Sequence, residues 1–148
     1  MTEAGMKPFI VIGVDGSEPS KDAVRWAAKQ AELTGAELHA VTAWRFPPTY
    51  GYPVDYSDVD FAAQARKTLE EVVAETLGPT PQVPVTARVI EGHPAAVLID
   101  ASRSADLLVV GSRGRGAFTE MLLGSVSQQC AHHASCPVVI VPPPERES

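Results

Sequence analysis

This chain has few cysteines, little positive charge and no long apolar run. No apolar stretch approaches the roughly 20 residues that span a bilayer, and the opening MTEAGMKP lacks the basic flank and apolar stretch of a signal peptide. Two cysteines in 148 residues do not make a disulfide scaffold. Twelve Lys and Arg against eighteen Asp and Glu give a net charge of -6, which argues against duplex nucleic-acid binding. We therefore expect a cytoplasmic protein with neither a membrane nor a nucleic-acid partner.

Recognisable catalytic and metal motifs are also missing. The chain has no Walker-type lysine, no G-x-S-x-G elbow and no obvious Ser, His and Asp set. Cys130, His133 and Cys136 do not have the paired spacing of structural zinc sites, because they straddle a helix end and a strand start. We expect packing roles for the cysteines, helix-end roles for His132 and His133, and neither a metal site nor catalytic residues.

A hydrophobic content of 45% is enough for one buried core, so we expect a single domain over residues 1–148, ordered from about 7 to 142 between short flexible tails. Apolar runs alternate with helical patterns, which predicts β-α units and a parallel sheet covered on both faces. The expected strands are Phe9–Val14, Glu37–Ala43, Val83–Ile90, Asp106–Val110 and Pro137–Val141. The expected helices end near Thr34, Leu77, Ser102 and Ala134.

Local signals predict where the helices begin and end. Ser17 is a candidate N-cap with Pro19 in the first turn, and Gly35 stands where a left-handed C-terminal residue is wanted. Ser57-x-x-Asp60 resembles a capping box for the second helix, which Gly78-Pro79 ends. The third helix opens at Pro94, and the last begins near Gly124.

Segment 44–57, WRFPPTYGYPVDYS, contains three prolines among several aromatic residues, so it predicts a long loop rather than a helix or an internal strand. Such a loop is usually functional or mobile. It is either a flap over a ligand or a surface excursion pinned by Tyr and Trp packing, and the residues do not decide between the two.

The segment with the clearest chemistry follows the fourth strand. Gly111, Gly114 and Gly116 lack a Cβ, so backbone N–H groups there can approach a phosphate or ribose closely. Nine residues beyond Gly114, Gly124-Ser125 begins a helix whose free N–H groups and positive dipole end favour an anion. The hydroxyls of Ser125 and Ser127 are available to the same oxygens, so loop and helix together predict a phosphate cradle.

This pattern, G-x2-G-x9-G-S after a buried strand, resembles the nucleotide-binding motif of the universal stress protein family, in its UspA-like ATP-binding subgroup. The resemblance covers nearly the whole chain, through the stretches Val11–Ser17, Gly92–Ala95, Ala105–Gly114, Leu123–Ser127 and Cys136–Val141. It implies a three-layer α/β/α sandwich with an open five-stranded parallel sheet of order 3-2-1-4-5, of the adenine nucleotide alpha hydrolase-like or Rossmann-like type. The site would then lie where the strand order reverses.

The resemblance also implies particular ligand contacts. Adenosine contacts fall to Gly13, Asp15 and the backbone near Ala43. Ribose and phosphate contacts fall to Gly111, Ser112, Arg113, Gly114, Arg115 and Gly116, and the α, β and γ phosphates to Gly124, Ser125, Val126 and Ser127. Asp15 could instead cap the following helix, Arg113 and Arg115 could be solvated loop charges, and His93 either approaches the ligand or only shapes a turn.

These features predict a universal stress protein that binds ATP, with Mg or Mn carried by the phosphates, and acts as a stress regulator or sensor with slow hydrolysis at most. A cyclic-AMP-binding member of the family and a nucleotide-independent dimeric interaction protein are the alternatives. A nucleotidyltransferase or a flavin-binding electron-transfer subunit is disfavoured, because no second domain or acceptor pocket can be identified. Val138–Val141 would leave backbone groups unpaired at a sheet edge; family members commonly dimerise through this strand, so we expect a homodimer.

Overall fold

The computed structural model describes residues 7–46, 49–56, 59–112 and 124–143. The strands of the described chain are β1 (Phe9–Gly13), β2 (Glu37–Trp44), β3 (Val85–Glu91), β4 (Leu107–Gly111) and β5 (Val138–Val141). They form one parallel sheet of order β3-β2-β1-β4-β5, which confirms the expected order. The helices are α1 (Glu18–Thr34), α2 (Phe61–Leu77), α3 (Pro94–Ala101) and α4 (Ser125–His133). None of the described helices is long and apolar enough to cross a bilayer.

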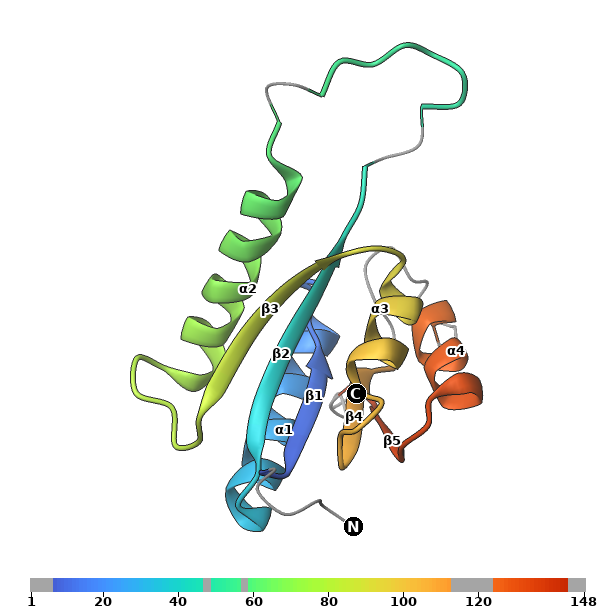
Figure 1. Cartoon of the computed structure of the whole chain (residues 1–148). Coiled ribbons are helices and arrows are strands. Elements are labelled where there is room, and N and C mark those ends of the chain that lie inside the picture. The colour runs from blue at the N-terminus through green and yellow to red at the C-terminus, as the bar shows by residue number, and fades with distance from the viewer. Residues whose placement is uncertain (1–6, 47–48, 57–58, 113–123, 144–148) are drawn as a thin grey trace, which may run out of the picture.

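The sheet is the middle of three layers, with α1 and α2 on one face and α3 and α4 on the other (Figure 1). β1 shows why the expected apolar runs become buried strands. Ile10 and Ile12 pack into the core shared with α1 and α2, whereas Val11 between them packs into the core shared with α3 and α4. Successive side chains of a strand point to opposite faces, so a strand covered on both sides must be apolar at every position.

The ends of α1 follow from local chemistry, as the sequence predicts. The Ser17 side chain accepts a hydrogen bond from the Ser20 N–H, and Pro19 lies in the first turn, where its missing N–H costs nothing. Gly35 ends the helix with a φ of 75°, a left-handed conformation in which a Cβ would be strained. Between these ends, Val24, Ala27 and Ala31 are fully buried against the sheet.

The start of α2 differs from the expected capping box. Asp60 is the N-cap itself: its carboxylate accepts a hydrogen bond from the Ala63 N–H at 2.9 Å, and the helix begins at Phe61. Ser57, the expected capping residue, lies outside the described residues. The predicted end at Gly78 is confirmed. The other observed bounds differ from the predicted ones by one or two residues; β3, for example, begins after Pro84, which has no N–H to donate to a ladder.

Candidate functional site

The carboxyl ends of the strands form one edge of the sheet, and the strand order reverses there between β1 and β4. The chain leaves β1 toward α1 on one face of the sheet, whereas α4, the helix after β4, packs on the other. Open parallel sheets bind ligands at such a point. The structure brings five of the predicted site residues to the carboxyl ends of β1, β2 and β4, which are neighbours in the sheet: Gly13, Asp15, Ala43, Gly111 and Ser112.

Asp15 follows β1 and is exposed. Its carboxylate accepts hydrogen bonds from the N–H of Ser17 at 2.9 Å and from the hydroxyl of Ser17 at 2.5 Å. Ser17 in turn caps α1 by accepting from the Ser20 N–H at 3.3 Å. The capping role that Asp15 could have had therefore belongs to Ser17, and Asp15 holds the capping residue in place. The adenosine contact of Asp15 stays a prediction.

Glycines at the ends of the two central strands allow helices to approach the sheet. A Cβ on Gly13 would lie 2.7 Å from Cδ1 of Leu98 in α3. A Cβ on Gly111 would lie 3.0 Å from the carbonyl carbon and oxygen of Pro19, in the first turn of α1. Sequence reasoning assigned Gly111 to the ligand and missed Pro19, because no local pattern shows that the two residues meet. Close packing of α1 is thus a second reason for a glycine at this position.

The start of α4 is tied to the end of β4 through Ser112. The Ser112 N–H donates to the carbonyl of Val141 in β5 at 3.0 Å, which keeps Ser112 in line with the sheet. Its carbonyl accepts from the N–H of Gly124 at 2.7 Å and from the hydroxyl of Ser127 at 3.1 Å. The Ser112 side chain is only 4% exposed, and its hydroxyl has no hydrogen-bond partner among the described residues.

The two hydroxyls predicted to meet phosphate differ sharply in position. Ser125 is exposed at the first turn of α4, whereas Ser127 is 2% exposed, with its hydroxyl within donating distance of the Ser112 and Gly124 carbonyls. Val126 packs its side chain against the core on the α3 and α4 face, so its phosphate contact, which stays a prediction, would fall to its backbone. Gly124 is the N-cap and offers no side chain, so this helix start has no side-chain cap.

Arg113, Gly114, Arg115 and Gly116 of the expected phosphate loop lie outside the described residues. Their predicted ribose and phosphate contacts therefore stay predictions.

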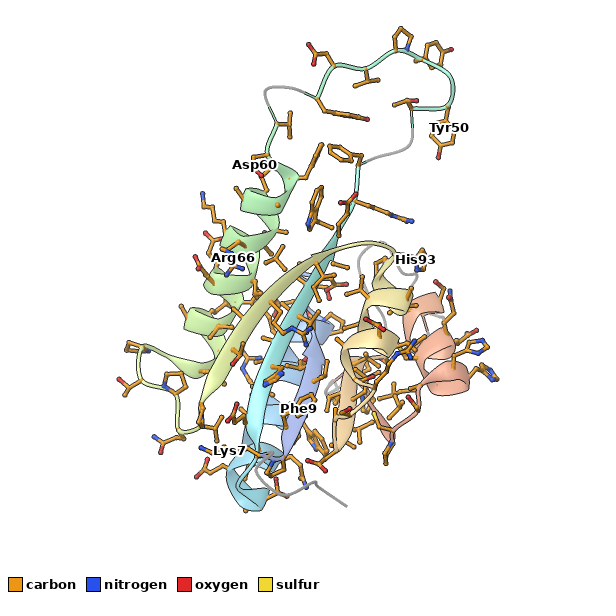
Figure 2. All side chains as sticks on the ribbon, in the orientation of Figure 1. Lys7, Phe9, Tyr50, Asp60, Arg66 and His93 are labelled. Carbon is orange, nitrogen blue, oxygen red and sulfur yellow. The ribbon has the colours of Figure 1, made fainter. Side chains whose placement is uncertain are left out.

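The end of β2 leads into the long loop that the prolines predict. Four aromatic rings from the two ends of this loop pack together, with centroid distances between 5.4 and 5.6 Å: Trp44, Phe46, Tyr56 and Phe61. Tyr50 and Tyr52, between those ends, are 85% and 75% exposed, and Figure 2 shows Tyr50 far from the sheet. The structure thus contains the aromatic packing expected of a surface excursion pinned by its aromatic residues, and Tyr50 and Tyr52 are exposed between its two ends.

His93 lies at the same edge of the sheet, where α3 begins (Figure 2). Its Nδ1 accepts a hydrogen bond from the N–H of Ala95 at 3.3 Å, so the ring serves as the N-cap of α3. The sequence left two roles open for His93, contact with the ligand or shaping of a turn, and this hydrogen bond supports the second.

The cysteines have the packing environment that the sequence predicts. Cys130 is fully buried in the core on the α3 and α4 face, Cys136 packs against that core, and both thiols are free. Burial, with a smaller contribution from Cys136, raises the pKa of Cys130 to about 11, so this thiol stays protonated near neutral pH. Among the described residues, no group of three His, Cys, Asp or Glu side chains could hold a metal ion.

The fold and the arrangement of this edge define a class: a three-layer α/β sandwich with a five-stranded parallel sheet of order 3-2-1-4-5. A family model described as the universal stress protein family matches residues 9–142. The chain belongs to the universal stress protein family.

Individual relatives agree with this membership. The chain is 37% identical over 148 residues to a universal stress protein of Mycolicibacterium smegmatis, an alignment that covers 95% of this chain and 50% of the relative. It spans about half the length of the curated relatives that it matches.

Solved structures are similar over almost the whole chain. One is a universal stress protein in complex with cAMP, with a TM-score of 0.63 and 27% identity over 91% of this chain and 97% of that one. Another is a universal stress family protein from Arabidopsis thaliana with AMP bound, with a TM-score of 0.57 and 21% identity over 93% and 92% of the two chains, a likeness that shows the fold.

Proposed function

We propose that this protein binds ATP at the carboxyl edge of the sheet, between β1 and the start of α4. The observation that carries the proposal is the buried Ser112 hydroxyl, which has no partner among the described residues and lies beside a helix start without a side-chain cap. Buried polar groups are nearly always hydrogen-bonded. An uncapped helix start offers free N–H groups and a positive dipole end to an anion.

The proposed ligand extends from β1 and β2 to α4. Adenosine would lie near Gly13, Asp15 and the backbone of Ala43, and the phosphates would extend past Ser112 to the start of α4. There the N–H groups of the first turn and the exposed Ser125 hydroxyl would donate to phosphate oxygens. These are anion-binding donors, so we propose that Mg or Mn arrives on the phosphates.

The role that we propose is that of a nucleotide-responsive stress regulator in the cytoplasm, with slow ATP hydrolysis at most. A ligand shifts the balance between two conformations by its differential affinity for them. Binding without fast turnover is sufficient for such a sensor. The cytoplasmic location rests on composition.

A cyclic-AMP-binding role is the second candidate, supported by the 27% identical relative in complex with cAMP. Cyclic AMP has one phosphate and would leave the start of α4 underused, whereas a triphosphate reaches it. Titration calorimetry with ATP, AMP and cyclic AMP separates the two. Tightest binding of ATP supports the proposal, tightest binding of cyclic AMP supports the second candidate, and no heat from any nucleotide supports the interaction-only alternative.

A substitution in the loop tests the location of the site. Gly114→Val places a branched side chain where phosphate must approach, so ATP affinity should collapse while the circular dichroism spectrum is kept. Gly35→Ala is the control for a glycine substitution away from the site: it strains the C-terminal end of α1, where φ is 75°, but no atom lies within 4 Å of the new Cβ, so ATP affinity should be kept. Unchanged affinity in Gly114→Val would move the ligand elsewhere.

We also propose a homodimer formed by antiparallel pairing of β5. This strand is at the edge of the described sheet, and its four residues are only partly buried. An apolar edge strand exposes unpaired backbone groups unless another strand covers it. A two-fold axis beside β5 would pair the two edges.

A further inference from the structure

Two serines in the first turn of α4 were expected to share one task, but the structure gives them different surroundings. Ser125 is exposed, whereas Ser127 is buried beneath the first turn. A serine hydroxyl has a single proton to donate. At Ser127 that proton is directed at two carbonyls, those of Ser112 at 3.1 Å and Gly124 at 2.9 Å. A phosphate oxygen accepts hydrogen bonds and would need a proton that Ser127 already uses.

The bond to Ser112 connects two elements that the chain separates. The Ser112 carbonyl accepts from both Gly124 and Ser127, and so uses both of its lone pairs on the start of α4. Its N–H is bonded to Val141 in β5. Among the described residues, Ser112 therefore links the first turn of α4 to the sheet by hydrogen bonds.

We infer that Ser127 is a positioning residue of the proposed phosphate site: by holding the Ser112 carbonyl, it sets the distance and direction of the start of α4 relative to the end of β4. Ser125 then supplies the hydroxyl that contacts the phosphate. This inference rests on the proposed function for its consequence, but the anchoring of α4 can be measured without any nucleotide.

A matched control exists in α1. Ser20 stands at the third residue of its helix, as Ser127 does, is 4% exposed, and donates to the carbonyl of the N-cap Ser17 at 2.8 Å. No hydrogen bond from its hydroxyl to a second element is observed among the described residues. Ser20→Ala therefore removes the same local bond without removing a connection to the sheet.

The first measurement is amide hydrogen exchange at Gly124 in the nucleotide-free protein. One hydrogen bond contributes about 0.5–1.5 kcal/mol, so Ser127→Ala should speed exchange there about two- to tenfold. Ser20→Ala and Ser125→Ala should leave it at the wild-type rate. Wild-type exchange at Gly124 in Ser127→Ala would overturn the inference.

The second measurement is calorimetry with ADP and ATP, whose phosphate chains would extend to the start of α4. A displaced helix start weakens every nucleotide that reaches it, so Ser127→Ala should lower both affinities by a similar factor, about two- to tenfold. Ser125→Ala should cost more for ATP than for ADP. A larger loss for ATP than for ADP in Ser127→Ala would show a direct contact and overturn the inference. If the wild-type protein binds no nucleotide, the proposed function fails, while exchange at Gly124 still decides the anchoring.

Discussion

Replacing Gly111 by alanine separates two explanations for a glycine at the end of β4. If the glycine serves only the ligand, adding a methyl group should not change the free energy of unfolding of the nucleotide-free protein. The structure predicts otherwise, because the new Cβ would lie 3.0 Å from the backbone carbonyl carbon and oxygen of Pro19 and 3.1 Å from its Cβ. Ordinary carbon contacts lie at about 3.5–4.0 Å, so the first turn of α1 would have to move by about 0.5 Å.

That turn cannot move freely. Ser17 caps it, Asp15 holds Ser17, and the Ser20 hydroxyl donates to the Ser17 carbonyl at 2.8 Å. Over-packing of this kind costs about 1–3 kcal/mol of stability. Alanine also restricts the unfolded chain more than glycine does, which stabilises the folded state by about 0.4–1 kcal/mol. We expect Gly111→Ala to lower the free energy of unfolding by about 1–2 kcal/mol. A slope of about 1–3 kcal/mol per molar urea then makes the lower unfolding midpoint measurable by circular dichroism.

Gly13→Ala is the control at the end of the neighbouring strand. Its Cβ would meet Leu98 at 2.7 Å, which is nominally closer, but the atom concerned is the end of a flexible side chain that can rotate away. We expect a change in unfolding free energy within about 1 kcal/mol, smaller than for Gly111→Ala. If Gly111→Ala unfolds at the wild-type urea midpoint but has lost ATP affinity, the packing argument is refuted. The ligand would then be the sole reason for the glycine.

Two further predictions concern the core and the edge of the sheet. Burial raises the pKa of Cys130 from 9.0 to about 11, and a thiol with a raised folded-state pKa stabilises the fold below pH 9 and loses that contribution as pH rises through 11. The urea midpoint should therefore fall across this window, and less steeply in Cys130→Ala; equal slopes would contradict the burial argument. The carbonyls of Pro137 and Val141 accept hydrogen bonds from the N–H groups of Leu108 and Ser112, on the β4 side of β5. Backbone groups of successive residues in a strand point to opposite sides, so the N–H of Ile140, next to Val141, points to the open edge of the sheet. Ile140→Pro should keep the sheet and yield monomers in sedimentation velocity at micromolar concentration, whereas a wild-type protein that is already monomeric would remove the dimer proposal.

Helix α1 shows what local sequence can predict. Serine at the N-cap, proline in the first turn and glycine at the C-terminus each act through their own backbone neighbours. No distant residue is needed, so the prediction is confirmed at both ends. The start of α2 is different, because Ser57 and Asp60 are both acceptable capping residues. In the structure the N-cap is Asp60, and the sequence pattern alone does not decide between the two residues.

The candidate site also has some features that local sequence predicts and others that it does not. The glycine spacing and its resemblance to a family predicted a phosphate cradle, but the spacing treats Gly111 as a ligand residue and does not show that Pro19 fills the space beside it. Ser125 and Ser127 are chemically identical in the sequence. Helix geometry turns one outward and the other beneath the first turn, where the Ser112 carbonyl binds it.

By itself, the sequence determined the alternation of strands and helices, the burial of the central strands and the family, because periodicity, capping and motif spacing are properties of neighbouring residues. The tertiary structure decided which glycine makes room for a helix, and which serine at the start of α4 is buried and which is exposed. Those assignments depend on contacts between residues far apart in the chain, and such contacts exist only once the layers have packed against each other.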